Sequence, residues 1–469
     1  MTRKGFLGSI VALGATGWAI RTEAAQGVFK PAGKLRLKAG VFSDLHISDE
    51  KSVAIVEKAL RHFRRERVDV VVCTGDVANT GLKSQLDLFE AVWDRVFPGG
   101  KGESGVPVER VFVTGNHDKG VMGQHTDASQ VKNHKTFLGE PLVPAFVRTV
   151  KGYSFVCQNW IHGKEARELI RAHASELKGS KPFFYLQHSH LKGTIPNAWI
   201  TDRGETTSVL KDFPNCVALT GHSHWPLVDE RSLWQGAFTA VNCACLRYCM
   251  QPGGRENTRT FGVVDPKTSQ MPPLDTMNDC QSAMVMCVYD DAIVFSRWDE
   301  KNALPLAADW VVPWPPNGEA AIEARAKRTP VPRFAAGAEV TVRRGKGTNR
   351  AGKSVEQVFV DFPNCRESDG SPVRAFDFEV SLETRLVDVV RPTSVKRVFS
   401  RGFYRAESKD EPTVTCAFGL EELPVAPKIN DGPKRSTAAY RFVVRPCNSF
   451  GAKGPEICTA WTELTGEEA

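Results

Sequence analysis

Residues 111–118 read Val-Phe-Val-Thr-Gly-Asn-His-Asp, an apolar strand that runs directly into a polar Gly-Asn-His-Asp turn. The stretch 68–76, Val-Asp-Val-Val-Val-Cys-Thr-Gly-Asp, repeats this design and ends in Gly-Asp. A short run of β-branched apolar residues bounded by turn residues is typical of a buried strand. The two stretches therefore predict buried strands at Val111–Thr114 and Val68–Thr74, each with polar side chains directly after it.

Three further polar motifs come after apolar strands in the same manner. They are Asp44-Leu-His46, His188 and Gly221-His222-Ser-His224, which come after strands expected at Leu35–Ser43, Phe183–Gln187 and Val217–Thr220. Ligands of open α/β sheets bind beyond the carboxyl ends of the strands. We therefore expect all five motifs to meet at one edge of the fold.

The segments between these strands indicate an α/β architecture. Helical apolar spacing occurs at Val53–Arg67, Leu82–Phe97 and Ala166–Leu177, and a further strand is expected at Gly152–Asn159. From Trp225 to Trp298 the pattern turns to consecutive strands. This alternation predicts an α/β domain with layered sheets.

The chain has 469 residues, more than the ~250–300 that one core usually reaches, so two domains are expected. Five prolines between residues 313 and 333 surround a helix-like Glu319–Arg328 and indicate a linker. The α/β domain is then expected at 34–312 and a second domain at 334–465.

The second domain is predicted to be an all-β sandwich, because short strands and turn residues alternate without a convincing long helix. The strands are expected at Glu339–Arg343, Glu356–Phe362, Val373–Leu382, Ser394–Arg405, Thr413–Phe418, Tyr440–Arg445 and Ile457–Trp461. The ending Tyr-Arg-Phe-Val-Val-Arg-Pro-Cys-Asn-Ser-Phe-Gly, residues 440–451, resembles the closing strands of fibronectin type III domains. No residue pattern in this domain indicates its partner.

Residues 1–27 are interpreted as an export segment. A basic head, Met1–Lys4, precedes the uncharged stretch Phe6–Ile20, and small residues at Ala24 and Ala25 would suit a signal peptidase. Residues 2–7 resemble the twin-arginine motif with Lys4 in place of the second arginine, and general secretion or a retained anchor fits the same segment. We expect an exported protein (periplasmic, on the cell surface or secreted), with no transmembrane helix in the mature chain.

The charge and the cysteine content bear on two further questions: nucleic-acid binding and disulfide formation. The net charge is +7, and no cluster of Lys and Arg interleaves with aromatic residues, so dedicated nucleic-acid binding is not expected. Twelve cysteines permit disulfides after export, and Cys447 and Cys458 flank an expected turn that such a bond could bridge. The alternative is that the thiols are buried as small apolar groups, which we favour for Cys73.

Among the residues of the five strand-end motifs, two Asp, one Asn and four His can act as ligands, all through nitrogen or oxygen. This set suits Fe, Mn or Zn ions. A carboxylate with ligands on both sides favours two ions ~3.5–4 Å apart. The sequence therefore predicts a centre that holds two divalent or trivalent metal ions.

The order of the motifs resembles the calcineurin-like metallophosphoesterases over roughly residues 35–310. This resemblance implies a layered α/β/β/α sandwich ahead of the all-β domain. It also implies a first metal held by Asp44, His46 and His224 and a second held by Asn116, His188 and His222, with Asp76 as the bridge. His190, two positions after His188, is the competing ligand and would otherwise lie at the pocket rim or behind the ligands.

The resemblance implies hydrolysis of a phosphoester by a hydroxide activated between the two ions. His117 would then assist the leaving group and Asp118 would orient His117, unless Asp118 caps a helix. Asn116, His117 and Asn79 would face the substrate, although Asn79 could instead cap the next helix. Purple acid phosphatases carry a tyrosine at the position of Asn79, so the iron-tyrosinate variant is not expected.

Two other functions compete with this interpretation. One is a cyclic-nucleotide phosphodiesterase, and the other is a non-catalytic surface binding protein that retains the metal site. A further motif, Gly347–Ser354, matches the phosphate-binding pattern G-x-x-x-x-G-K-[ST]. Residues 355–362 have the alternation of a strand where phosphate binding would need a helix, so we interpret the motif as a hairpin loop.

Overall fold

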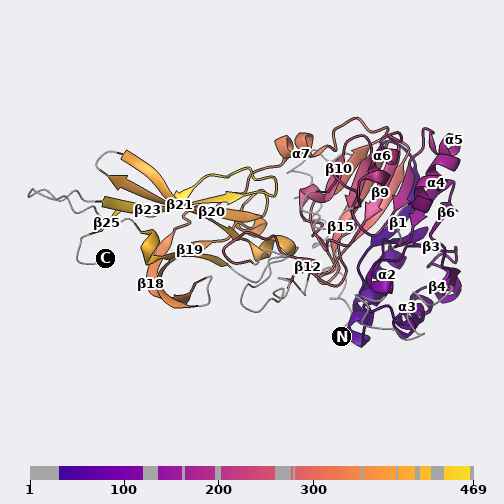
Figure 1. Cartoon of the computed structure of the whole chain (residues 1–469), viewed down its shortest axis with the longest axis horizontal. Helices are drawn as coiled ribbons and strands as arrows, with labels where there is room; N and C mark the ends of the chain where they lie inside the picture. Colours follow the sequence, from indigo (N-terminus) through magenta and orange to yellow (C-terminus); the bar gives the residue numbers. More distant parts are fainter. Residues whose placement is uncertain are drawn as a thin grey trace, which may run out of the picture.

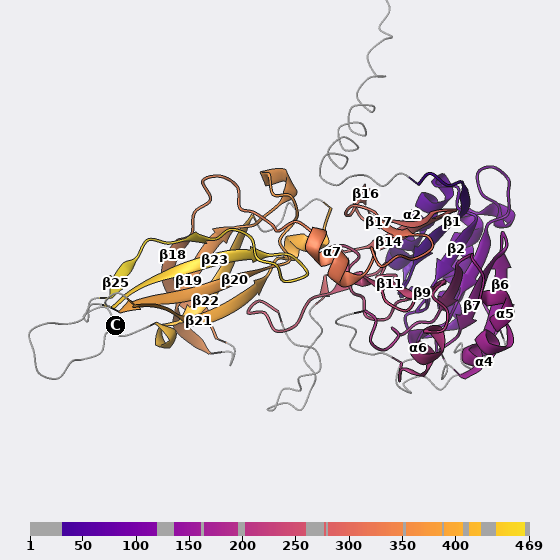
Figure 2. The same ribbon diagram turned by 90° about the horizontal axis from the view of Figure 1, so that it is seen from above.

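The computed structural model describes residues 31–119, 136–160, 164–195, 202–258, 276–277, 280–349, 353–386, 389–406, 412–423 and 438–464. The proposed export segment, residues 1–27, lies outside them. Two bodies lie end to end, with helix α7 (Ile322–Arg328) at their junction (Figures 1 and 2). No helix among the described residues has the length and apolar character that crossing a membrane requires.

The first body contains two sheets. The first sheet has the order β16-β15-β14-β1-β2-β3, with β17 also paired to β15. Its strands are β1 (Leu35–Phe42), β2 (Val70–Cys73), β3 (Glu109–Phe112), β14 (Ser282–Tyr289), β15 (Ala292–Asp299), β16 (Leu304–Pro305) and β17 (Trp310–Pro313). Strands β1, β2 and β3 are parallel, and β14 joins β1 in the antiparallel sense.

The second sheet has the order β10-β11-β9-β8-β7-β6. Its strands are β6 (Ala145–Val150), β7 (Tyr153–Gln158), β8 (Phe183–Leu186), β9 (Cys216–Thr220), β10 (Leu233–Gln235) and β11 (Thr239–Asn242). Strands β7, β8, β9 and β11 are parallel to one another. Both sheets therefore have a parallel centre, whose strands end at a common edge.

Strand β2 is apolar at every position because both of its faces are buried. Val70 and Val72 belong to the core between the two sheets, whereas Val71 and Cys73 belong to the core under the first sheet's helices. A parallel strand that is covered on both faces reads as a continuous apolar run. The burial of Cys73 confirms its interpretation as a small apolar group.

Helices cover the outer face of each sheet. Helices α2 (Glu50–Arg65) and α3 (Lys83–Val96) share a core with the first sheet, and α4 (Lys164–Ala172), α5 (Ala174–Leu177) and α6 (Glu205–Leu210) share one with the second. A third core lies between the sheets. The layers are thus helix, sheet, sheet and helix, which confirms the predicted α/β/β/α sandwich.

The second body is made of antiparallel strands around its own core. One sheet has the order β18-β19-β22 and the other β21-β20-β23-β24, with β25 also paired to β23. The strands are β18 (Thr341–Thr348), β19 (Ser354–Pro363), β20 (Asp377–Leu386), β21 (Val389–Phe399), β22 (Thr413–Gly419), β23 (Ala438–Cys447), β24 (Ile457–Cys458) and β25 (Thr462–Leu464). This arrangement is consistent with the predicted β-sandwich. Thr348 lies opposite Ser354, so the Gly347–Ser354 motif belongs to the β18–β19 hairpin, as interpreted.

Several local expectations need correction. The helix expected at Ala166–Leu177 is broken at His173 into α4 and α5, and β6 was not predicted. The strand expected at Ser394–Arg405 ends at Phe399 and is followed by the short helix η7 (Arg401–Tyr404). All twelve cysteines are free thiols. The possible bond between Cys447 and Cys458 is not formed, because the β23–β24 register places Cys458 opposite Val443.

Candidate metal centre

The five polar motifs meet because their strands end at the same edge of two facing sheets. Asp44, Asp76 and Asn116 come after β1, β2 and β3, and the histidine motifs come after β8 and β9. Hydrogen bonds tie the two sheets together at this point. The backbone N–H of His222 donates to Asp44 Oδ2 over 3.0 Å.

Most of these motifs require an unusual backbone conformation. Asp44, His46, Asp76, His222 and His224 all have φ between 44° and 70°. Residues other than glycine rarely adopt this left-handed region, at a cost of roughly 1–3 kcal/mol each, and such residues concentrate at functional sites. Neighbouring loops hold the conformation, since the N–H groups of Asp44 and His46 each donate to the loop after β2 over 3.0 Å.

The first group of side chains consists of Asp44, His46 and His224. Asp44 Oδ1 lies 3.0 Å from His224 Nε2 and 3.8 Å from His46 Nε2. The two imidazole Nε2 atoms are 3.2 Å apart. All three side chains are buried, and their ligand atoms lie within 4.8 Å of one another. This geometry suits one metal ion.

The second group consists of Asp76, His188 and His222. Asp76 Oδ2 lies 3.1 Å from His188 Nε2, which is in turn 3.1 Å from His222 Nδ1. The same Asp76 oxygen lies 3.8 Å from His46 Nε2 in the first group. Asp76 therefore lies between the two groups, where the resemblance places the bridging ligand.

The chemistry of these atoms fits a pair of cations. Among the described residues, Asp44 Oδ1, Asp76 Oδ2 and Asn116 Oδ1 are buried oxygens without a hydrogen bond. Buried oxygens without a hydrogen bond are uncommon and indicate an ion or water that completes the site. Each group also brings two imidazole nitrogens to within 3.1–3.2 Å of each other, and neutral imidazole nitrogens are good metal ligands. The residues present therefore fit two metal ions.

The pKa shifts of the site also favour bound cations. Burial alone would raise the pKa of Asp76, but the imidazoles of His188 and His46 outweigh it and lower that pKa to about 2. Burial alone would lower the pKa of His188, but the Asp76 and Asp44 carboxylates raise it to about 9. The carboxylates thus stay ionised and draw positive charge to the site, which a metal would supply in place of the His188 proton.

His188 and His190 differ in their partners. His188 Nδ1 lies 2.8 Å from the Thr74 carbonyl, which leaves Nε2 directed at Asp76. His190 is fully buried, and its two nitrogens contact the hydroxyls of Thr220 and Ser223 at 2.6 and 2.7 Å. His190 therefore lies behind the ligands and holds the turn that presents His222 and His224.

Asp118 does not make the contact with His117 that was expected. Among the contacts of the described residues, Asp118 does not orient His117: its carboxylate accepts the N–H groups of Ala78 and Gly115, each over 2.8 Å. The His117 ring is held by its Nδ1 contact with the Asn79 carbonyl at 2.7 Å. Asp118 joins the loops after β2 and β3 because both loops leave backbone donors beside it. Asn79 thus contacts this site through its backbone.

Sequence reasoning missed two aromatic side chains at the site. Tyr248 lies beside the first group, with its ring centroid 4.3 Å from that of His224. Trp160 lies beside the second group, 5.4 Å from His222 and 5.6 Å from His188. Both rings are half-buried. No spacing in the sequence connects them to the motifs, and only the position of Trp160 just after β7 offered a signal.

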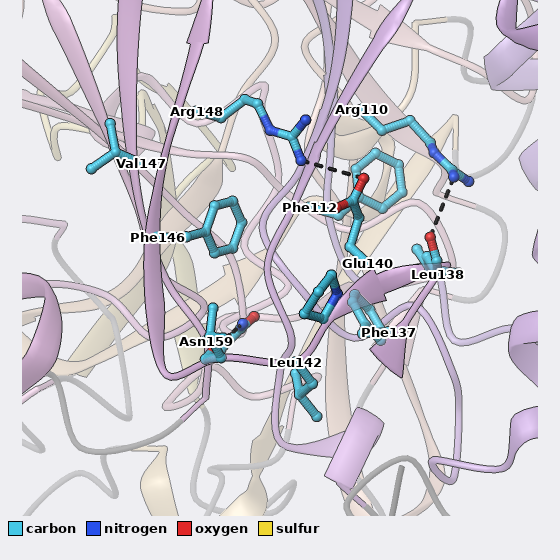
Figure 3. A pocket seen from close by; sticks show the side chains of 12 residues that line it. Arg110, Phe112, Phe137, Leu138, Glu140, Leu142, Phe146, Val147, Arg148 and Asn159 are labelled. Atoms are coloured by element: carbon cyan, nitrogen blue, oxygen red, sulfur yellow. Dashed lines mark hydrogen bonds and ion pairs between the residues drawn. The ribbon is translucent and has the colours of Figure 1, made fainter. Parts of the chain in front are cut away.

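A cavity of about 330 Å³ lies apart from this centre, at the edge where β3 and β6 face each other (Figure 3). Its walls include Phe112, Phe137 and Phe146, with Arg110 and Arg148 at the polar side. Part of its wall is the hairpin of β4 (Thr136–Phe137) and β5 (Glu140–Pro141). None of the candidate metal ligands lines it, so the chemistry is assigned to the strand-end centre and not to this cavity.

Metal removal provides a direct test of the centre. We expect a chelator to lower the thermal unfolding midpoint by about 5–10 °C and added Mn²⁺ to restore it. A ligand at a hundred times its dissociation constant stabilises the folded state by about 2.7 kcal/mol, which corresponds to a shift of this size. Thermal unfolding with and without Mn²⁺ measures the effect, and the Asp44→Ala variant should show no shift. Equal midpoints for the chelated and Mn²⁺-loaded wild type would contradict the assignment.

A comparison with protein families agrees with the geometry. The model of the calcineurin-like phosphoesterase family matches residues 37–261. No curated protein matches the chain. Among solved structures, a dimetal phosphatase from Danio rerio is similar at 13% identity and a TM-score of 0.37, over 60% of this chain and 100% of the other.

Two further solved structures are similar over a comparable share of the chain. GAP50, described as the anchor in the inner membrane complex of Plasmodium, has 13% identity and a TM-score of 0.37, over 61% of this chain and 90% of the other. A predicted phosphoesterase from Streptococcus pneumoniae has 15% identity and a TM-score of 0.27, over 59% and 97%. The family model thus covers residues 37–261, the part of the chain that holds both candidate ligand groups.

Proposed function

We propose that this chain hydrolyses a phosphoester at a two-metal centre. The observation that carries the proposal is the pair of adjoining ligand groups, Asp44-His46-His224 and Asp76-His188-His222, which meet at Asp76. Asn116 adds a buried amide oxygen without a hydrogen bond. Metal ions held in this way would act as Lewis acids that acidify a water molecule and neutralise phosphoryl oxygens.

The chain's own residues prepare the reaction in three ways. Asp76 fixes the loop after β3, since its Oδ1 accepts the His117 N–H over 2.8 Å. The Asn79 carbonyl accepts from His117 Nδ1–H, so Nε2 is the ring atom that, in the imidazolium form, would give its proton to the leaving-group oxygen. The ring of His117 stands edge-on to His46, with centroids 4.5 Å apart, and is half-buried.

Hydrolysis of model substrates tests the proposal. We expect the Mn²⁺-loaded protein to hydrolyse bis-p-nitrophenyl phosphate or p-nitrophenyl phosphate. The His117→Ala variant should lose about 10²–10⁴-fold in kcat, as removal of a general acid does, while it still binds two metal ions. The Asn116→Ala variant should lose both activity and metal affinity. His173→Ala is the matched control, because this partly exposed histidine lies between α4 and α5, outside both ligand groups, and is expected to leave activity unchanged.

The results of this experiment distinguish a phosphoesterase from the alternative functions. Unchanged kcat in His117→Ala would remove His117 from the mechanism. Two bound ions without hydrolysis of either substrate would favour the non-catalytic binding protein. A high diester-to-monoester ratio would favour a phosphodiesterase.

A cyclic-nucleotide phosphodiesterase is the second candidate. The supporting observation is the pair of aromatic rings, Trp160 and Tyr248, at opposite ligand groups, since aromatic faces suit a nucleobase. Hydrolysis of cyclic AMP at a rate above that of bis-p-nitrophenyl phosphate would support this candidate. No hydrolysis of cyclic nucleotides beside an active model diester would exclude it.

A further inference from the structure

One segment, residues 245–258, runs from the metal centre to the β-sandwich, and we call it the strap. Its first part lies against the candidate ligands. The Cys245 thiol contacts the Asp44 carbonyl at 3.2 Å, and the Met250 N–H donates to the His224 carbonyl over 3.0 Å. Between these two residues, Tyr248 lies beside the His224 ring. The strap therefore forms one wall of the centre.

The second part of the strap is bound to the sandwich. The Tyr404 hydroxyl donates to the Met250 carbonyl, and Met250 lies in β12 (Cys249–Met250), between the two bodies in Figure 1. Asn257 exchanges two hydrogen bonds of 2.8 Å with the backbone of Phe399, at the end of β21. Arg255 forms an ion pair of 2.8 Å with Asp377 at the start of β20. The Glu256 N–H also donates to the Arg397 carbonyl over 2.8 Å, so sandwich residues hold the strap at four places.

The surroundings of these contacts stabilise the junction. Asp377 is fully buried and also pairs with Arg397 at 2.7 Å. Phe376, Phe403 and Tyr404 of the sandwich belong to the same apolar cluster as Trp225, the residue after His224. Breaking a buried, paired charge leaves the other charge without its partner at a high free-energy cost, so these contacts resist opening.

A second connection reaches the same ligand from the other side. The Trp225 Nε1–H donates to Asp229 over 2.8 Å, and Asp229 also pairs with Arg231. The Arg231 guanidinium lies 5.0 Å from the centre of the Phe376 ring of the sandwich. Both neighbours of His224 along the fold, Met250 and Trp225, are therefore supported by sandwich side chains.

We propose that the β-sandwich is a positioning element of the metal centre, and that Tyr404 holds His224 and Tyr248 in place through Met250. The role of the sandwich would then be to support the first domain of the same chain. Its catalytic consequence rests on the proposed function, whereas its consequence for metal binding does not. Residues that support metal ligands typically change metal affinity by about 10–100-fold when they are replaced.

The test uses the full-length chain with single substitutions. Tyr404→Phe removes one hydroxyl and keeps the ring, and Asn257→Ala removes the two bonds to Phe399. We expect each variant to bind Mn²⁺ about tenfold more weakly in equilibrium dialysis. We also expect KM for a model phosphoester to rise more than kcat falls, because the wall that carries Tyr248 is less well held.

Two control variants separate positioning from loss of stability. Tyr440→Phe removes the same hydroxyl elsewhere in the sandwich, on β23. Val380→Ala opens the sandwich core at a fully buried position and lowers its stability without touching the strap. Both should keep wild-type Mn²⁺ affinity, even where the unfolding midpoint of Val380→Ala falls below that of Tyr404→Phe.

The possible results are distinct. Weaker Mn²⁺ binding in Tyr404→Phe and Asn257→Ala, with both controls unchanged, supports the proposal. Wild-type affinity in Tyr404→Phe and Asn257→Ala overturns it, as does an equal loss in Val380→Ala. A wild-type protein that hydrolyses no phosphoester, together with weaker Mn²⁺ binding in the two strap variants, would refute the proposed function and leave this inference standing.

Discussion

Replacing Asp76 by asparagine is expected to lower kcat/KM for a model phosphoester by at least about a thousandfold, a loss of about 4 kcal/mol in transition-state stabilisation. Asp76 is the carboxylate that reaches both ligand groups, at 3.1 Å from His188 and 3.8 Å from His46. Asparagine keeps the size and one acceptor oxygen but removes the negative charge between the two proposed ions. The repulsion between those ions would then be poorly offset, so we expect at least one of them to be lost.

Metal analysis and steady-state kinetics on the same sample check this prediction. Asp87→Asn is the matched control, because Asp87 is an exposed carboxylate that pairs with Lys83 on the surface of α3. It should retain both metal ions and full activity. An Asp76→Asn variant with two bound ions and activity within tenfold of wild type would show that Asp76 is not the bridge.

The positions of the ligands could be predicted from the sequence because each depends on a local rule. Apolar runs such as 68–74 form parallel strands that are buried on both faces, and residues directly after them must then lie at the common edge. Asp44, Asp76 and His188 obey this rule without any knowledge of loop conformation. The left-handed conformation of Asp44 and Asp76 is not visible in the sequence, but it changes the direction of the side chain and not the edge where the residue lies.

The walls of the site could not be predicted, because they depend on tertiary packing. Tyr248 reaches His224 only through the strap, whose course is set by contacts with a second domain more than a hundred residues away. Likewise, Asp118 lies beside two backbone donors that the packing of separate loops creates. His62 is a further example, since it is buried and contacts Glu300 at 2.7 Å because α2 packs against the end of β15.

Gly115→Ala is expected to reduce activity by at least about a hundredfold while the protein stays folded, through the addition of one methyl group. A Cβ atom at Gly115 would lie 2.1 Å from Asp76 Oδ1 and 2.7 Å from the Asp76 backbone nitrogen, closer than non-bonded atoms approach. Asp76 cannot move away without loss, since the same oxygen accepts the His117 N–H over 2.8 Å. The displaced carboxylate would leave the proposed bridging position and release His117, and misplacement of about 1 Å can cost 10²-fold in rate.

The measurement combines kcat/KM, Mn²⁺ stoichiometry and the thermal unfolding midpoint. Gly179→Ala is the control, because a Cβ atom there meets its nearest neighbours at an ordinary 3.9 Å and should change none of the three quantities. Since the methyl group displaces Asp76 itself, a large excess of Mn²⁺ should not restore Gly115→Ala to wild-type activity. Full rescue by Mn²⁺ would mean that the loop after β3 yields to the methyl group and that the short contact between Gly115 and Asp76 is not what fixes the centre.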